Sequence, residues 1–315
     1  MRNRKLYATF VLPAPNGCNL KCPFCAIAQR GEATRSRLGG EDYVRFLSDI
    51  LAGLAVTRVS IQGYEPLLPE AWPLTERLLR LANAYFCETS VVTNGTYLAE
   101  HAGELGRLVD TATVSLDSDQ AAVHDRLRGV AGAHEQALNG LRAAQAALPG
   151  RLNVNSVLFP NRAEYLNGMP KLLAQLGIKE WVISPMISFR QKGYIPKLSF
   201  IKKEMARLAD EAESLGVNVL LSDELRTTEE TDLFETLSIR SLEAGDAIFR
   251  LSPDGSCSRG REILGSAGAV PMWDTAEQPA KFVKRIFAEF DSPLRMRRAP
   301  VRTLLARYAN MTARV

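Results

Sequence analysis

The stretch that decides the fold is LYATFVLPAPNGCNLKCPFC, residues 6–25, where an apolar, β-rich run meets a cluster of cysteines. The run Leu6–Val11 predicts a first strand, and the prolines after it predict a loop. Cys18, Cys22 and Cys25 therefore follow a strand directly, where a loop faces the mouth of an α/β barrel. Three thiolates in such a loop indicate a metal site, because cysteines are the usual ligands of iron–sulfur clusters.

Strand-like and helix-like segments alternate along the chain beyond this stretch. The expected strands are Arg58–Gln62, Thr89–Thr93, Thr111–Leu116, Leu152–Phe159 and Glu180–Ile187, and the expected helices are Asp42–Leu54, Glu70–Ala84, Tyr97–Leu108, Glu135–Leu148 and Ala163–Leu176. Such alternation implies parallel strands with right-handed crossovers. We therefore expect an α/β fold, either a partial (β/α)6 barrel of the TIM type or an open sheet, with ligands at the carboxyl ends of the strands.

The pattern changes after residue 187. A helix over Phe200–Leu215, short strands over Val217–Leu221 and Ala247–Leu251, an acidic run over Asp223–Glu235 and a basic, helical Ala280–Val315 are expected there. We place the barrel core in residues 1–222 and a C-terminal extension that covers the substrate site in residues 223–315.

Composition excludes several classes of protein. The 315 residues are 46% apolar and carry a net charge of +4, a small and dispersed excess that gives little support for nucleic-acid binding. No apolar stretch is long enough to span a membrane. The five cysteines are an odd number and three fall within eight residues, which favours a reducing, cytoplasmic location over a disulfide framework. The apolar run near the N-terminus is too short for a signal peptide and leads straight into prolines.

The alternative to an iron–sulfur cluster is a structural zinc site. Zinc takes four ligands at compact spacing, so a fourth ligand should lie near the three cysteines. The histidines His101, His124 and His134 are all distant in sequence. The ligand count therefore favours iron and sulfur.

The Cys-x3-Cys-x2-Cys spacing, with Phe24 before the last cysteine, resembles the radical S-adenosylmethionine (SAM) superfamily over about residues 6–190. The resemblance implies a partial barrel of the radical SAM kind, one [4Fe–4S] cluster on Cys18, Cys22 and Cys25, and SAM as co-substrate. It also implies an external one-electron reductant.

Further motifs after the strands strengthen this resemblance. Gln62-Gly-Tyr-Glu-Pro66 is similar to the family's Gly-Gly-Glu-Pro, although Tyr64 departs from the small residue that is usual there. In the family Glu65 would hold the SAM amino group and Arg128 its carboxylate, Ser115 would contact SAM, and Met186 would lie near the adenine. The resemblance thus implies cofactor contacts from Phe24, Gly63, Tyr64, Glu65, Asn94, Ser115, Asp117, Arg128, Asn155 and Met186.

Each of these residues also has a purely structural interpretation. Gly63 is compatible with a turn, Ser115 and Asp117 with helix caps, and Asn155 with a core amide. Their joint occurrence at the ends of consecutive strands favours the functional interpretation.

Cys257 is the one cysteine beyond residue 87, so the chain holds a single cluster. It stands in Ser252-Pro-Asp-Gly-Ser-Cys-Ser-Arg-Gly260, a run of small residues that predicts a loop rather than an apolar core. We interpret it as a hydrogen donor that returns hydrogen to the opposite face of a substrate radical, with a buried structural thiol as the alternative. Cys87 is interpreted as structural.

This layout is similar to a narrower group, the radical SAM epimerases of aminoglycoside biosynthesis. That likeness implies inversion of one carbon of an amino sugar or aminoglycoside, with Cys257 as donor. The acidic run that contains Asp223, Glu224 and Glu229 suits a polycationic substrate, or is simply solvated charge.

Two other hypotheses stay open. A radical SAM dehydrogenase or dehydratase on a sugar alcohol or aminoglycoside would make Cys257 incidental. A metal-stabilised RNA-binding module would use the basic C-terminal segment and would not cleave SAM, but so modest a charge is weak evidence for it.

Overall fold

The chain folds into one sheet with helices packed along it. The computed structural model describes residues 6–13, 17–25, 36–160, 162–186, 198–221, 247–259 and 271–287. The strands are β1 (Leu6–Leu12), β2 (Val56–Gly63), β3 (Glu88–Thr93), β4 (Thr111–Ser115), β5 (Leu152–Leu158), β6 (Glu180–Pro185), β7 (Asn218–Leu221), β8 (Ala247–Leu251) and β9 (Cys257–Arg259). The helices are α2 (Gly40–Gly53), α3 (Trp72–Ala84), α4 (Leu98–Leu108), α5 (Ala121–Arg128), α6 (Ala133–Ala144), α7 (Met169–Gln175), α8 (Leu198–Ser214) and α10 (Pro279–Phe287), with a 3-10 turn η2 at Glu164–Leu166.

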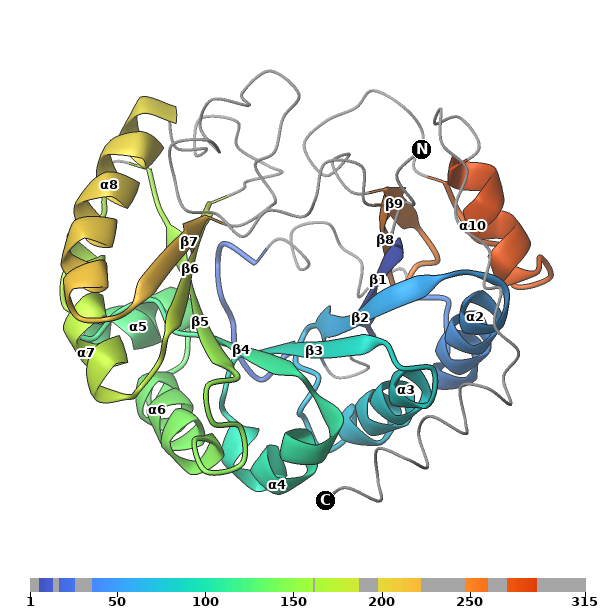
Figure 1. Ribbon diagram of the computed structural model, residues 1–315, viewed down its shortest axis with the longest axis horizontal. Helices are drawn as coiled ribbons and strands as arrows, with labels where there is room; N and C mark the ends of the chain where they lie inside the picture. The colour runs from blue at the N-terminus through green and yellow to red at the C-terminus, as the bar shows by residue number, and fades with distance from the viewer. Residues whose placement is uncertain are drawn as a thin grey trace.

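The sheet is an open, curved one. Its order over the described residues is β7-β6-β5-β4-β3-β2-β1-β8-β9, in which neighbours from β7 to β8 are parallel and β9 runs antiparallel to β8. Helices α2, α3, α4, α6, α7 and α8 follow its convex side (Figure 1). The predicted partial α/β barrel is therefore confirmed, extended by parallel strands β7 and β8 at its two sides.

Alternation along the strands leaves one face of the sheet for a site. On β4, β5 and β6 every second residue is buried, and the residues between them are half-buried. Side chains alternate between the two faces of a strand, so the buried set packs under the helices. Ser115 and Asn155 belong to the other set and lie on the concave face.

Aromatic side chains fasten the C-terminal elements to the N-terminal ones. The Phe46 ring of α2 stacks on Phe249 of β8 at 5.3 Å, and meets Trp273 edge-on at 4.7 Å and Phe282 of α10 at 6.5 Å. Phe10 of β1 adds an edge contact at 6.2 Å. Such pairs add to the free energy gained by burying their large apolar area.

Several local predictions need correction. The helix expected over residues 163–176 is divided into η2 and α7, because Pro170 suits only the first turn of a helix and a new helix begins at Met169. Helix α5 was not predicted, since its eight residues are too few for clear periodicity. The boundary near residue 222 and the acidic run fall in residues 222–246, outside the described residues, as does the chain beyond residue 287.

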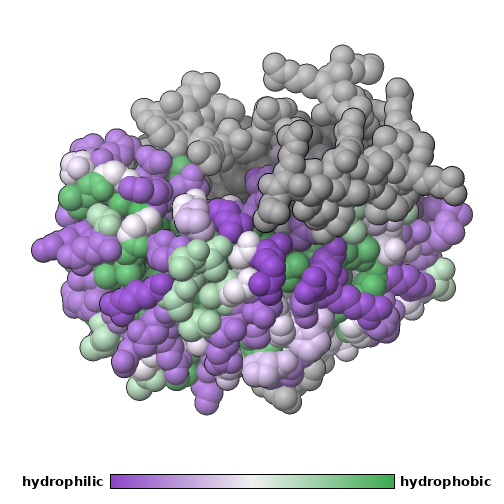
Figure 2. Space-filling model, turned by 60° about the horizontal axis from the view of Figure 1, so that its bottom comes forward, coloured by the Kyte–Doolittle hydropathy of each residue, from purple (hydrophilic) through white to green (hydrophobic). Residues whose placement is uncertain are grey.

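The surface is mainly polar on the face shown in Figure 2, where hydrophobic residues occur in small groups among hydrophilic ones. Large apolar residues exposed within the described parts are Leu215 and Met272. In those same parts no helix combines the length and the apolar character that crossing a membrane requires.

We predict that Phe46→Ala lowers the free energy of unfolding by about 3–5 kcal/mol, the cost typical of a buried phenylalanine, because the ring is fully buried among four aromatic neighbours. Urea denaturation followed by circular dichroism measures this. The control Leu215→Ala removes an exposed side chain and should change the value by less than about 0.5 kcal/mol. Equal stability of the two variants would refute the assigned role of the aromatic cluster.

Candidate functional site

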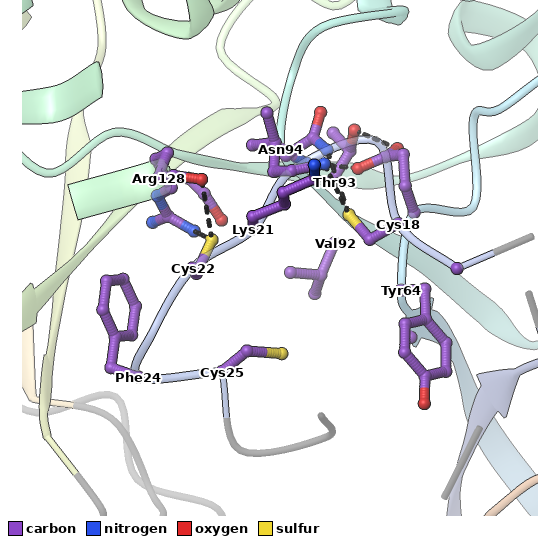
Figure 3. A pocket seen from close by; sticks show the side chains of 15 residues that line it. Cys18, Lys21, Cys22, Phe24, Cys25, Tyr64, Val92, Thr93, Asn94 and Arg128 are labelled. Atoms are coloured by element: carbon purple, nitrogen blue, oxygen red, sulfur yellow. Dashed lines mark hydrogen bonds between the residues drawn. The ribbon is translucent and has the colours of Figure 1, made fainter. Parts of the chain in front are cut away.

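The thiols of Cys18, Cys22 and Cys25 line one pocket of about 340 Å³ at the carboxyl ends of the parallel strands. The loop after β1 forms one wall, and the ends of β2, β3, β4 and α5 form the others. The lining residues are Gly17, Cys18, Leu20, Lys21, Cys22, Phe24, Cys25, Gly63, Tyr64, Glu65, Val92, Thr93, Asn94, Ser115 and Arg128. Figure 3 shows Cys22 beside Arg128, Cys18 beside Asn94, and Cys25 between them.

Two asparagines attach the cysteine loop to the loop after β3. Asn94 Nδ2 donates a 2.8 Å hydrogen bond to Asn19 Oδ1, and Asn19 Nδ2 donates a 2.9 Å bond to Thr96 Oγ1. The backbone N–H of Leu20 donates to Cys18 Sγ at 3.4 Å. These bonds fix Cys18 relative to β3.

A buried ion pair holds the other side of the loop. Arg128 Nε lies 2.7 Å from Asp117 Oδ2, and the two side chains are 9% and 0% exposed. The carbonyl of Arg128 accepts a 2.9 Å bond from Lys21 N, and Arg128 Nη1 lies 4.0 Å from Cys22 Sγ. The guanidinium also lies over the Phe24 ring at 5.4 Å. Three residues of the loop, Lys21, Cys22 and Phe24, thus contact one arginine.

Glycine is required beside this arginine. Gly129 has φ +73°, and a Cβ there would lie 2.4 Å from the carbonyl oxygen of Lys21. The cysteine loop therefore approaches the end of α5 more closely than any residue with a side chain permits.

Glu65 is a buried carboxylate prepared for a cation. Its Oε1 accepts bonds from Thr93 Oγ1 at 2.6 Å and from Leu67 N at 3.0 Å, and its Oε2 accepts one from Asn94 N at 2.6 Å. Burial raises the pKa of this carboxyl to about 7, against the lowering effect of those bonds and of the Arg128 charge. A cationic ligand in the pocket would favour the ionised form.

Residues 12–165 match the family model described as "Radical SAM superfamily". This part of the chain is a radical SAM domain. Solved structures agree on the fold: Streptococcus suis SuiB aligns with a TM-score of 0.63 at 17% identity, over 93% of this chain and 67% of that one.

Curated relatives match somewhat more than half of the chain. "Probable GTP 3',8-cyclase" of Methanopyrus kandleri is 32% identical over 173 residues, 54% of each chain. "GTP 3',8-cyclase" of Xanthomonas axonopodis pv. citri is 31% identical over 193 residues, 59% of this chain and 52% of that one. This chain thus spans about half the length of the curated relatives it matches.

The cofactors of a radical SAM domain are a [4Fe–4S] cluster and SAM. The pocket fits both. Nowhere in the described residues do three His, Cys, Asp or Glu side chains converge closely enough to bind a single metal ion. Thiols spaced around a common pocket suit a larger cluster instead, and Glu65 suits the SAM ammonium.

Burial keeps the thiols of Cys18 and Cys22 protonated. It raises the pKa of Cys18 to about 11 and raises that of Cys22, where the Arg128 charge works in the opposite direction. Cluster ligands must be thiolates, so cluster binding releases protons from this loop.

Most of the predicted SAM contacts converge on the pocket. Phe24, Gly63, Tyr64, Glu65, Asn94, Ser115 and Arg128 all line it. Their individual contacts with SAM remain predictions.

Three residues that were predicted to contact SAM do not line the pocket. Asp117 is fully buried behind Arg128 and also accepts a 3.0 Å bond from Val157 N, so it reaches the pocket only through the arginine. Asn155 Oδ1 accepts a 2.7 Å bond from Ser184, and neither Asn155 nor Met186 lines the pocket. Their order along the chain could not show these side-chain directions.

The expectation that Cys257 lies in a loop outside the apolar core is wrong. Cys257 begins β9 and is fully buried, and burial raises the pKa of its thiol well above the usual value. Cys257 pairs with Leu251 of β8. Leu251 lies on the same face of β8 as Phe249, whose ring stacks on a phenylalanine of α2. Residues opposite one another in an antiparallel pair share a face, so the thiol points toward the helices.

Sequence reasoning missed Asn19, which ties the cysteine loop to Asn94, and gave no role to Thr93. Thr93 donates to Glu65 and in turn accepts a 3.0 Å bond from Gly95 N. A polar residue directly after the first cysteine is a weak signal that could have pointed to Asn19.

We predict that SAM binds the cluster-loaded protein more weakly as the pH falls below about 7. Glu65 then takes up a proton and loses the charge that complements the ammonium, so affinity falls by up to about tenfold per pH unit. Equilibrium dialysis between pH 5.5 and 7.5 measures this. Glu65→Gln should bind weakly at all of these pH values, and a wild-type affinity independent of pH would contradict the assignment.

We also predict that Gly129→Ala prevents normal cluster loading, because the new methyl group displaces the loop at Lys21. Iron and sulfide content after anaerobic reconstitution measures loading. Gly132→Ala is the matched control, since Gly132 has a similar φ of +83° but nothing within 4 Å of its Cβ position. Equal iron content in the two variants would show that the close approach is unimportant.

Proposed function

We propose that this chain is a single-cluster radical SAM enzyme that abstracts a hydrogen atom from a small polar substrate. The observation that carries the proposal is one pocket lined by Cys18, Cys22, Cys25 and the buried carboxylate of Glu65. The thiols would hold three irons of the cluster and leave the fourth open to SAM.

The bound cofactors supply one-electron cleavage of SAM and a 5′-deoxyadenosyl radical, which removes hydrogen from the substrate. Glu65 binds the SAM ammonium and fixes the end of SAM that faces the cysteines. Arg128 Nη2 is buried and has no hydrogen-bond partner among the described residues, so it is available to the SAM carboxylate. Tyr64 borders the same pocket.

For the reaction, we propose inversion of one carbon of an amino sugar or aminoglycoside. The support is the sequence resemblance around Cys18–Cys25, together with Cys257 as the one cysteine beyond residue 87. Hydrogen return by Cys257 requires the β8–β9 hairpin to turn this thiol to the concave face.

Inversion of the carbon takes two electrons from the reductant and one proton from solvent in all. One electron from the reductant cleaves SAM, and the C–H hydrogen ends in deoxyadenosine. The carbon radical takes hydrogen from the Cys257 S–H on the other face. The sulfur radical left behind takes one more electron and one proton from the reductant and solvent.

A purine nucleotide is the second candidate substrate. The observation that favours it is the match to the two relatives named as GTP 3',8-cyclases. That match covers only about half of their length.

We predict substrate-dependent deoxyadenosine from reconstituted, reduced protein with SAM in D2O. Aminoglycosides and GTP are assayed separately by mass spectrometry. An inverted aminoglycoside that gains one deuterium supports the epimerase, and a product two mass units lighter would replace it by a dehydrogenase. Turnover of GTP alone would favour the second candidate. Deoxyadenosine absent under every condition would overturn the radical SAM proposal itself.

Two cysteine variants test the donor. Cys257→Ala should still form deoxyadenosine but lose inversion. Cys87→Ala is the matched control, because Cys87 is equally buried but bonds to Val56 O at the opposite end of the sheet. Full inversion by Cys257→Ala would remove this thiol from the mechanism.

A further inference from the structure

Arg128 makes a contact that SAM binding does not explain. Its Nη1 lies 4.0 Å from Cys22 Sγ, and the same sulfur lies 3.7 Å from the carbonyl oxygen of Arg128. Figure 3 shows both contacts on one side of the pocket. A buried cation thus sits beside a predicted cluster ligand.

The position of this cation is fixed from behind. Asp117 binds Nε at 2.7 Å, and its other oxygen accepts from Val157 N of β5. Asp117 N donates a 3.1 Å bond to His124 Nδ1, and burial lowers the pKa of His124 to about 4, so this neighbour is neutral near pH 7. Lys21 also lines the pocket, but Arg128 is the cation whose charge acts on the Cys22 thiol, and Asp117 is its partner.

Charges near an iron–sulfur cluster shift its reduction potential, as do hydrogen bonds to its sulfurs. Reduction adds negative charge to the cluster, so a nearby cation stabilises the reduced form and raises the potential. Burial strengthens the effect because little water screens it. Asp117 acts in the opposite sense, and its charge acts on Cys22 less strongly than that of Arg128.

We propose that Arg128, held in place by Asp117, raises the reduction potential of the cluster through its charge and its contact with Cys22. The inference rests on the proposed function, since it requires the cluster. It makes Arg128 a positioning and tuning residue for electron uptake in addition to its predicted contact with SAM.

The test is a redox titration of cluster-loaded protein without SAM or substrate, followed by electron paramagnetic resonance. Arg128→Gln should shift the midpoint potential to more negative values. Asp117→Asn should shift it to more positive values, because a negative charge is lost while the amide oxygen of the same shape can still accept a hydrogen bond from Arg128 Nε. Arg128→Lys keeps the charge and should stay closer to wild type than Arg128→Gln.

Arg151→Gln is the matched control. Arg151 also binds within the fold, donating to the carbonyls of Val109, Gly106 and Ala147, and it precedes β5 at the end of the sheet away from the cysteines. Its loss should weaken the fold and leave the potential unchanged. A merely structural role for Arg128 would give the same result.

Shifts of the same sign in Arg128→Gln and Asp117→Asn, or no shift in either, would overturn the proposal. If Arg128→Gln does not load iron, Asp117→Asn still decides, because the proposal requires a positive shift of the midpoint potential in that variant. A wild-type protein that binds no cluster would instead refute the proposed function.

Discussion

The buried pair of Asp117 and Arg128 is the contact on which the arrangement of the site depends. Two charges out of water are tolerable only when each satisfies the other, so neither side chain has freedom to move alone. The cysteine loop packs against Arg128: it contacts the carbonyl and the guanidinium of this residue, and the glycine that follows leaves room for the close approach. One ion pair thereby joins the loop after β1, the end of β4 and the end of α5.

The two faces of the sheet have different roles: one packs into the apolar core and the other carries the site. Buried residues under the helices supply the apolar core, and the concave face is left with polar side chains at the strand ends. Glu65, Asn94 and Ser115 come from three neighbouring strands, yet they line the same pocket because parallel strands end at one edge.

Local patterns were sufficient to predict the cysteine site, since Cys18, Cys22 and Cys25 are close in sequence and their spacing constrains the loop. Strand–helix alternation likewise predicted the sheet. Side-chain direction was beyond such patterns: Asp117 follows a strand as a ligand would, but turns to Arg128. Cys257 stands among small residues, but its pairing with Leu251 points it to the helices. Both outcomes depend on neighbours far away in sequence.

Strand β1 lies between β2 and β8, so the strand formed by residues 6–12 gains one of its neighbours only after residues 247–251 have been synthesised. A nascent chain on the ribosome therefore carries the complete cysteine loop long before one edge of β1 and the aromatic side of α2 are covered. An uncovered strand edge invites pairing with other chains. This edge therefore has to be protected until residues 247–287 emerge. The need for protection follows from the order of the strands in the sheet and not from the chemistry of the site.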